Sequence, residues 1–368
     1  MKVCIVVFGA IHYSVALTAA LSEYCYIDFY CSEYHLKKGD SSIINLLKDN
    51  VRVNCYGKYR NRDLRNLFIY YKLCRKIKSK KYDVIHFQDV GTPWMALFWI
   101  ICKKYPLVMT VHDPSPHLGL PIAHKIYRNI MQRIFVNKAN KIIVHGNLLK
   151  NQVLERYFKK TFEDVVVIPH GEFSILKYWD KKGKSNKKIS QLKKILFFGY
   201  IRPNKGLEYL IKAEPFIRKH VSDYMIIIAG ICDAFDKYEK YIEPDSKIKI
   251  INKYIPDKEV PEYFRNTSVV VLPYISATQS GIIPLAYSFG KPVIATRVGS
   301  MPEIIEDGKT GFLVEPRNEK DLANAIIKLI SDDKLIKMMS ENALRYCKRN
   351  LSWDSIAKRT IKVYSEIS

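Results

Sequence analysis

The chain alternates short apolar runs with helical patterns, and this alternation restricts its fold more than any other feature. Most of the runs are rich in β-branched residues and continuously apolar, which is typical of parallel strands covered on both faces. Helical patterns lie between them, so each half of the chain is predicted to form an α/β doubly wound sheet. The predicted strands are 2–8, 26–31, 51–55, 83–87, 107–111, 142–145 and 165–168 in the first half, and 195–198, 224–229, 247–251, 268–272, 292–295 and 312–314 in the second.

The alternation stops once, and this interruption divides the chain. Residues 177–194 carry eight Lys or Arg, one acidic residue and few apolar residues, a composition typical of an exposed linker. The length of 368 residues is enough for two domains. We therefore expect two Rossmann-like domains that face a central cleft. The expected divisions are 1–175, a basic linker at 176–194, 195–350, and a C-terminal helix at 351–368 that can pack back on the first domain.

Part of the net charge of +24 is concentrated in two stretches of the first half. Residues 57–81 carry ten Lys or Arg and one acid, and residues 124–141 carry five Lys or Arg and no acid. Apolar residues share a helical face in each stretch: Leu64, Leu67, Phe68, Tyr71 and Cys74 in the first, and Ile126, Ile130, Ile134 and Phe135 in the second. A solvated charged face over an ordinary core stripe would explain either helix alone. Two such helices favour attachment to an anionic membrane surface.

Other classes of partner and location are less well supported. No helix-turn-helix, zinc-finger or RNP signature occurs, so nucleic acid is not an expected partner. No stretch is long enough to span a bilayer, and the first apolar run is too short for a signal peptide. Eight cysteines occur without a C-x-x-C pair, so neither a zinc site nor a disulfide framework is indicated. We expect a cytoplasmic protein, peripheral on the inner face of the plasma membrane.

The segment Phe197–Gly206 predicts an anion site. It consists of an apolar strand, a glycine turn with Arg202 and Lys205, and then a helix. Such a junction directs free backbone N–H groups and the positive end of the helix dipole at one point. Two cations at that point suit a diphosphate, although an ordinary strand–helix joint with two solvated charges is the alternative.

Further polar residues follow the other predicted strands, where ligands of such sheets bind. Gly9 follows the first strand, His112 the fifth and His170 the seventh, whereas His86 and His145 are expected only to pack at strand ends. No G-x-G-x-x-G or P-loop motif occurs, which argues against a nicotinamide cofactor or a P-loop NTPase. No D-x-D occurs either. We expect no metal and no cofactor, with Arg202 and Lys205 supplying the positive charge instead.

Several segments, taken in order, resemble one enzyme family over nearly the whole chain. They are Asp83–His86, Thr110–Asp113, Phe198–Leu207, Phe289–Thr296 and Val298–Val314. In these segments the chain resembles the retaining GT-B glycosyltransferases of family 4. The resemblance implies that the first domain binds the acceptor and the second binds a nucleotide sugar, with UDP or GDP as the nucleotide.

The resemblance also implies roles for individual residues. Arg202 and Lys205 would neutralise the donor diphosphate, and His112 would lie near the transferred sugar; these three are the expected catalytic residues. Glu303 would line the base and ribose end. The full expected donor-binding set is Gly9, His170, Gly199, Arg202, Lys205, Gln279, Ser280, Gly281, Ile282 and Glu303.

The chain departs from the family pattern at two positions. The family usually has two glutamates before its Gly-Lys-Pro-Val segment, and Ala277 and Leu285 stand there instead. The first glutamate normally contacts the sugar and the second holds the ribose. Gln279, Ser280 and the backbone N–H groups around Gly281 are the expected substitutes for contacts with the sugar hydroxyls.

The expected activity is that of a retaining hexosyltransferase. It would move a sugar from a nucleotide diphosphate to a lipid-linked or glycan acceptor in the synthesis of a surface polysaccharide, such as a capsule, an O-antigen of lipopolysaccharide or an exopolysaccharide. No protein nucleophile is needed if the acceptor attacks on the leaving-group face. Two alternatives stay open: a GT-B nucleotide-sugar 2-epimerase, and a non-enzymatic member of the fold that only binds.

Overall fold

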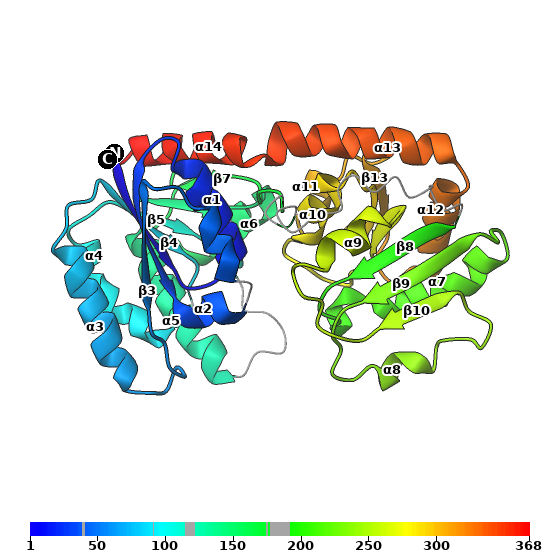
Figure 1. Cartoon of the computed structure of the whole chain (residues 1–368), viewed down its shortest axis with the longest axis horizontal. Helices are drawn as coiled ribbons and strands as arrows, with labels where there is room; N and C mark the ends of the chain where they lie inside the picture. The colour runs from blue at the N-terminus through cyan, green and yellow to red at the C-terminus, as the bar shows by residue number, and fades with distance from the viewer. Residues whose placement is uncertain (39–40, 91, 115–121, 174–175, 177–191) are drawn as a thin grey trace. The chain divides into compact units, whose positions relative to one another are not determined.

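The computed structural model describes residues 1–38, 41–90, 92–114, 122–173, 176 and 192–368. These residues form two compact units (Figure 1). The first consists of Met1–Gly171 and Trp353–Ser368, and the second of Glu172–Ser352. Most of the predicted linker at 176–194 lies outside the described residues. Its last residues belong to the second unit's first strand, which begins at Lys193 rather than at the predicted residue 195.

The first unit is built on a seven-stranded parallel sheet of order β3-β2-β1-β4-β5-β6-β7. Its strands are β1 (Lys2–Val7), β2 (Tyr26–Ser32), β3 (Val51–Tyr56), β4 (Val84–Gln88), β5 (Leu107–Thr110), β6 (Lys141–Val144) and β7 (Val165–Val167). The α-helices are α1 (Ile11–Leu21), α2 (Glu33–Lys38), α3 (Arg65–Lys78), α4 (Trp99–Cys102), α5 (Ile122–Lys138), α6 (Asn147–Arg156) and α14 (Trp353–Ser365), with 3₁₀ helices η1 (Ser41–Leu46) and η2 (Pro93–Phe98). The predicted doubly wound sheet is confirmed in this half.

The second unit repeats the architecture with six parallel strands in the order β10-β9-β8-β11-β12-β13. The strands are β8 (Lys193–Phe198), β9 (Tyr224–Ala229), β10 (Ile248–Ile251), β11 (Val269–Leu272), β12 (Val293–Thr296) and β13 (Gly311–Val314). The helices are η4 (Pro203–Lys205), α7 (Leu207–Arg218), α8 (Asp236–Glu239), α9 (Val260–Arg265), α10 (Ile282–Ser288), α11 (Met301–Ile304), α12 (Glu319–Ile330), α13 (Asp333–Tyr346) and the π-helical turn η5 (Cys347–Leu351). Every residue of β11 and β12 is buried, which explains their continuously apolar sequences.

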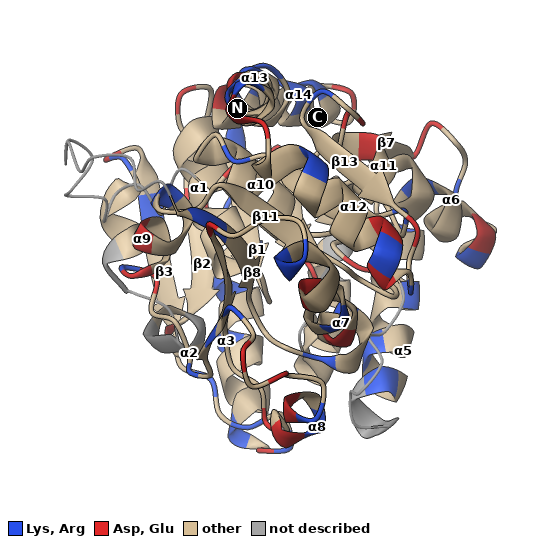
Figure 2. Cartoon of the chain, turned by 90° about the vertical axis from the view of Figure 1, so that its right-hand side faces the viewer, with Lys and Arg blue, Asp and Glu red and all other residues tan. Residues whose placement is uncertain are grey.

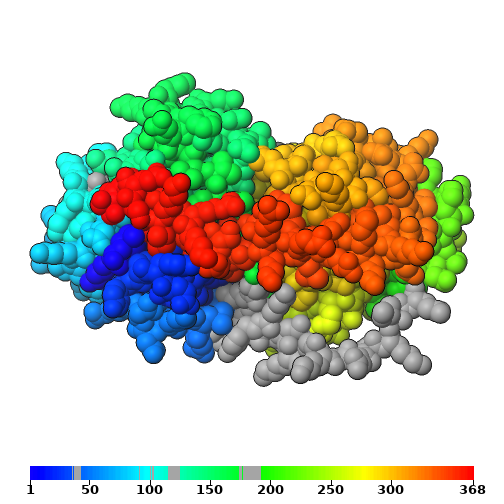
Figure 3. Space-filling view, turned by 90° about the horizontal axis from the view of Figure 1, so that it is seen from above, coloured from blue at the N-terminus to red at the C-terminus, as the bar shows by residue number. Residues whose placement is uncertain are grey.

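The C-terminal helix α14 belongs to the first unit. It packs against α1, as Figure 3 shows, where its red atoms lie beside the blue N-terminal residues. Tyr24 donates a hydrogen bond to Asp354 (2.8 Å) at one end of the helix, and Lys141 pairs with Glu366 (2.9 Å) at the other. The ring of Trp353 closes against Gly171, where an added Cβ would meet it at 2.6 Å. The last residues of the chain therefore complete the core of its first half.

The turn between β8 and α7 is held by a close backbone approach at Gly206. This residue has φ 62°, and a Cβ added to it would lie 2.0 Å from the carbonyl oxygen of Pro273. Asn204 reinforces the approach, because its carbonyl accepts a hydrogen bond from the N–H of Ile275 (2.9 Å) and its side chain donates to Ser276 (3.1 Å). The turn that carries Arg202 and Lys205 is thus fastened to the loop after β11.

Because of this close approach, we expect two glycine substitutions to lower the free energy of unfolding by different amounts. Gly206→Ala should destabilise the second unit by about 4 kcal/mol or more, because the methyl group meets a backbone atom and the left-handed conformation disfavours it. Gly308→Ala is the matched control: its φ is 74° but nothing lies within 4 Å of an added Cβ, so only the conformational cost of about 1–2 kcal/mol applies. Calorimetry, with hydrogen exchange of the α7 peptides, measures both. Equal losses would contradict the close approach.

Candidate functional site

Three loops of the second unit meet at the carboxyl edge of its sheet. They follow β8, β11 and β12. Besides the Asn204 contacts, a Cβ on Gly199 would lie 3.8 Å from Cδ1 of Ile282, and the N–H of Ser300 donates to the carbonyl of Thr278 (3.0 Å). Of the predicted donor-binding residues, Gly199, Lys205, Ser280 and Ile282 are therefore brought together here, and Glu303 lies on the adjoining α11.

Arg202 and Lys205 provide positive charge at this edge without a compensating acid. The Lys205 ammonium lies 3.7 Å from the centre of the Tyr274 ring, and the Arg202 guanidinium 4.7 Å from that of Tyr200. Neither side chain forms an ion pair with a described carboxylate. Burial, and secondarily Arg202, lowers the pKa of Lys205 from 10.5 to about 8. Two cations that repel each other and lack a counter-ion form a site that an anion would stabilise.

The loop 277–282 carries no charged side chain. The Ser280 hydroxyl is buried, accepts a hydrogen bond from the N–H of Ile282 (3.3 Å) and lies 3.5 Å from the Tyr274 hydroxyl. It therefore serves as a hydrogen-bond acceptor at the first residue of α10. Leu285 is buried and Ala277 half-buried. Neither of the two family glutamates is therefore replaced by another acid at its own position. Thr278 and Gln279, both half-buried, are the other polar side chains of this loop, and Gln279 is the one predicted to contact the sugar.

Gly9, His112 and His170 belong to the first unit and lie at the carboxyl edge of its sheet. Gly9 leads into α1 through Ala10, which has φ 49°. Asp89, after β4, has φ 64° and lies close to Gly9, since a Cβ there would be 3.4 Å from its Oδ2. Asp89 also pairs with Arg128 of α5 (3.4 Å). Left-handed conformations at two non-glycine residues in adjoining loops mark this edge as a strained region of the kind found at functional sites.

A cluster of four rings surrounds Tyr13 of α1 at the same edge. The ring centres of His112 and His170 each lie 4.9 Å from that of Tyr13, and those of His145 and Trp353 lie 5.2 Å away. The sequence did predict His112 and His170, but His145 was expected only to pack, and Tyr13 and Trp353 were not singled out. The position of His145 directly after a strand was the available signal, because the carboxyl ends of parallel strands share one edge.

The histidines of this cluster are held neutral. Burial lowers the pKa of His145 from 6.5 to about 3 and that of His170 to about 4. The pKa of His112 is also well below its usual value, first through burial and then through His145, His170, Arg128 and His86. His145 donates from Nδ1 to the carbonyl of Ile168 (2.9 Å), and its Nε2 lies 2.9 Å from Nδ1 of His112. No group of three or more described His, Cys, Asp or Glu side chains is arranged to hold a metal ion.

A second notable surface of the first unit combines exposed apolar and basic side chains on α3, α4 and α5. We call it the basic apolar surface. Leu64, the N-cap residue of α3, is 72% exposed. Within the helix Phe68 is 68% exposed and Leu67 and Tyr71 are also exposed, whereas Cys74 is buried. Cys74, which was predicted to share an apolar helical face with these residues, instead packs with Tyr70, Leu73 and Ile77 in the core. Ile126 and Ile130 are likewise exposed on α5, while Phe135 is buried and Ile134 half-buried.

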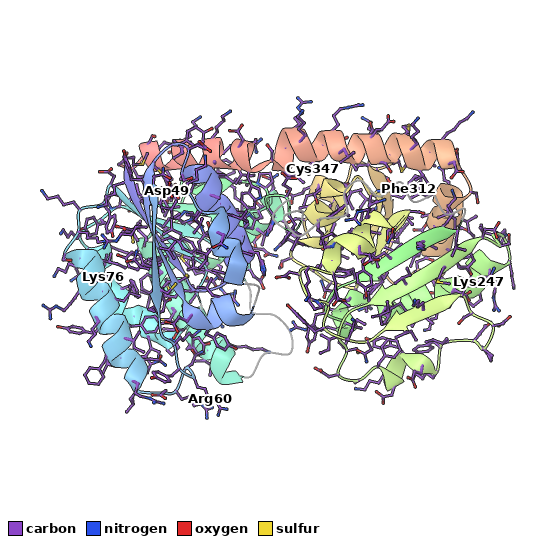
Figure 4. The ribbon with its side chains drawn as sticks, viewed as in Figure 1. Asp49, Arg60, Lys76, Lys247, Phe312 and Cys347 are labelled. Atoms are coloured by element: carbon purple, nitrogen blue, oxygen red, sulfur yellow. The ribbon has the colours of Figure 1, made fainter. Side chains whose placement is uncertain are left out.

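Basic side chains surround these exposed apolar residues. Lys72, Arg75, Lys76 and Lys78 lie on the exposed side of α3, where Figure 4 labels Lys76. The Lys76 ammonium donates to the side-chain oxygen of Asn54 (2.8 Å). Lys and Arg also mark α5 in Figure 2. A groove of about 410 Å³ between α3 and η2–α4 is lined by Tyr71, Cys74, Arg75, Lys78, Ser79, Leu97 and Ile101. No helix in the described parts of the chain has the length and apolarity needed to cross a membrane.

Comparison with known families shows that both halves of the chain match glycosyltransferase families. Residues 13–171 match the family described as Glycosyltransferase Family 4, and residues 180–346 match Glycosyl transferases group 1. An uncharacterized glycosyltransferase of Methanocaldococcus jannaschii is 28% identical over 91% of this chain and 90% of its own length. The phosphatidyl-myo-inositol mannosyltransferase of Mycolicibacterium smegmatis is 22% identical over 81% of this chain and 74% of its own.

A solved structure shares the fold over its entire length. The structure of Anabaena HepE in complex with UDP superposes with a TM-score of 0.72 at 17% identity, covering 100% of both chains. The same protein has been solved with UDP-glucose, with a TM-score of 0.71 and 18% identity over 100% of both chains.

The neutral histidines predict that acid destabilises the first unit. An imidazole with a folded pKa below 6.5 contributes stability that is complete above pH 6.5 and is lost as pH falls, because the unfolded chain then binds the extra proton. At pH 5 the loss should be about 2 kcal/mol for each such histidine. Melting curves followed by tryptophan fluorescence between pH 7.5 and 5 measure it. His170→Asn, which keeps a donor for Gly171, should reduce the pH dependence; an unchanged slope would contradict burial of a neutral His170.

Proposed function

This chain is a glycosyltransferase with the GT-B fold, and on that basis we propose that it transfers a sugar, with retention, from a nucleotide diphosphate to a lipid-linked or glycan acceptor. The nucleotide would be UDP or GDP, and the product would contribute to a surface polysaccharide. The enzyme would work without metal or cofactor on the cytoplasmic face of the plasma membrane, as a retaining member of family 4.

The uncompensated Arg202–Lys205 pair is the observation that carries the donor proposal. As the sugar–phosphate bond breaks, the nucleoside diphosphate gains negative charge, so cations fixed at its position stabilise the transition state more than the ground state. Both cations lie on a turn whose backbone is fastened by the close approach of Gly206 to Pro273. That HepE has been solved with UDP and with UDP-glucose supports a donor of this class.

Retention is proposed from the family resemblance, and a retaining transfer does not require acids at positions 277 and 285. Ala277 and Leu285 supply no nucleophile or base there. Attack by the acceptor hydroxyl on the leaving-group face needs neither, because the departing phosphate oxygen can take the proton. Gln279 and the backbone around Gly281 would contact the sugar, and Glu303 the nucleoside.

Substitutions at Arg202 and Lys205 test the donor site. Arg202→Ala and Lys205→Met should each reduce kcat by roughly 10²–10³, the cost of losing one preorganised charge stabiliser, with the melting temperature of the second unit unchanged or higher. Radiolabelled sugar transfer from UDP- and GDP-sugars to membrane lipid extracts measures it. Turnover that survives either change would exclude this assignment.

The lowered pKa of Lys205 gives a second test, based on binding alone. Above about pH 8 the free enzyme loses the Lys205 proton that a diphosphate requires, so UDP affinity should fall by up to tenfold per pH unit. Lys205→Arg should bind UDP with little pH dependence up to pH 9.5, because arginine stays charged. Calorimetric titration with UDP at pH 7, 8 and 9 compares the two. A wild-type affinity that does not change with pH would place the diphosphate elsewhere.

The basic apolar surface carries the membrane part of the proposal. Exposed Leu64, Leu67, Phe68 and Tyr71 on a helix that also carries Lys72 and Arg75 match the pattern of a helix lying in an anionic interface. The cytoplasmic leaflet attracts such segments by about 1 kcal/mol per basic residue. The phosphatidyl-myo-inositol named in the mycobacterial relative is a lipid, which supports a lipid-linked acceptor.

Vesicle binding tests this surface. The wild type should bind phosphatidylglycerol vesicles, and the binding should weaken as salt is added. Lys72→Ser/Arg75→Ser should weaken it by about 30-fold at low salt, and Leu64→Ser/Phe68→Ser should weaken it at both low and high salt. Lys337→Ser/Met338→Ser on α13 is the matched control and should have no effect. Equal binding to phosphatidylcholine at every salt concentration would reject the proposal.

A further inference from the structure

The hydrogen bonds of His145 determine which of its nitrogens carries a proton. Its Nδ1 faces the backbone carbonyl of Ile168 at 2.9 Å, and a carbonyl oxygen can only accept, so Nδ1 carries the hydrogen. His145 is 3% exposed and its ring packs against Tyr13, His112 and His170. A second proton would place a charge in this enclosed cluster, so Nε2 keeps its lone pair.

The state of His145 then determines the state of His112. Nε2 of His145 and Nδ1 of His112 are 2.9 Å apart, and a hydrogen bond between them needs one donor. Because the His145 nitrogen is the acceptor, His112 must donate from Nδ1, and its own Nε2 is left with a lone pair. That Nε2 atom is buried and has no hydrogen-bond partner among the described residues. A buried acceptor without a partner costs about 1–3 kcal/mol, so a hydrogen-bond donor on a bound ligand would stabilise this atom.

We propose that His145 is a positioning residue that holds His112 in its Nδ1–H form, so that Nε2 of His112 accepts a hydrogen bond from the bound substrate. The chemical class of the contacted group follows: it must donate a hydrogen, as a sugar hydroxyl does, whereas a phosphate or carboxylate oxygen would meet a lone pair. This inference rests on the proposed function for the identity of the substrate. The lone pair on Nε2 of His112 suits a neutral donor group, whereas the charges of Arg202 and Lys205 suit an anion.

Nitrogen-15 NMR of the full chain with labelled histidine tests the tautomer without any ligand. At pH 7.5 both His145 and His112 should show a protonated Nδ1 and an unprotonated Nε2, with the signals assigned by loss in the His145 and His112 variants. His145→Gln presents an amide oxygen that can accept from His112 and should preserve the Nδ1–H form. His145→Phe removes the acceptor and should allow the Nε2–H form. An Nε2–H or doubly protonated His112 in the wild type would overturn the proposal.

Binding separates the sugar contact from the diphosphate contact. In calorimetry with UDP and UDP-glucose, His145→Phe should lower the affinity for UDP-glucose about fivefold, the value of one hydrogen bond, and leave UDP affinity unchanged. His145→Gln should restore most of the loss. His86→Phe is the matched control: it also removes a buried imidazole, one that bonds to Tyr364 and Thr110 rather than to His112. It should lower the melting temperature without altering the His112 tautomer.

The outcomes distinguish this inference from the proposed function. If the wild type binds neither UDP nor UDP-glucose, the donor assignment fails, while the NMR spectrum still decides the tautomer. If UDP binds and the spectrum shows Nδ1–H at His112, but His145→Phe leaves the preference for UDP-glucose over UDP unchanged, the positioning role fails. Should His145→Phe not fold, the wild-type spectrum and His145→Gln decide the question.

Discussion

Positive charge without a counter-ion at the carboxyl edge of the second sheet is the constraint on which the chemistry of this protein depends. Such charge is unfavourable in the ligand-free protein, since Arg202 and a partly buried Lys205 repel each other. The fold holds it in place through the close approach of Gly206 to Pro273 and through the face of the Tyr274 ring, an arrangement worth about 0.5–2 kcal/mol to a cation. The free-energy cost of holding two like charges close together is therefore met on folding rather than on ligand binding, which is what preorganisation requires.

The carboxyl edge of the first unit's sheet has the opposite electrostatics. Burial keeps His112, His145 and His170 neutral, and a backbone carbonyl, Ile168, fixes the direction of the hydrogen bonds that join two of them. A carbonyl oxygen can only accept a hydrogen bond, so Nδ1 of His145 must donate to it. The Nε2 atom of His145 is then the acceptor, and Nδ1 of His112 must donate. The C-terminal helix contributes Trp353 to this cluster, which makes the integrity of the first unit's site depend on residues more than 150 positions away in the sequence.

The basic apolar surface lies on elements that share the first unit's core with the site. The same helix α3 that buries Tyr70, Leu73 and Ile77 exposes Leu64 and Phe68 on another side. Large exposed apolar side chains carry a cost in water, and the closely spaced Lys72, Arg75, Lys76 and Lys78 repel one another. Both costs are relieved at an anionic interface, where the apolar groups leave water and the charges find counter-ions.

The sequence by itself determined the two parallel sheets, because continuous apolar runs separated by helical periods allow few other packings; each predicted strand is present with small shifts at its ends. It also identified Arg202 and Lys205, since the glycine turn and its cations are contiguous. Contacts between distant segments were decided only by the tertiary structure. α3 has two apolar stripes, and periodicity does not tell which one meets the core. His145 looked like an ordinary strand-end residue, because its role arises from three separate strand ends meeting at one edge, a proximity that no local pattern records.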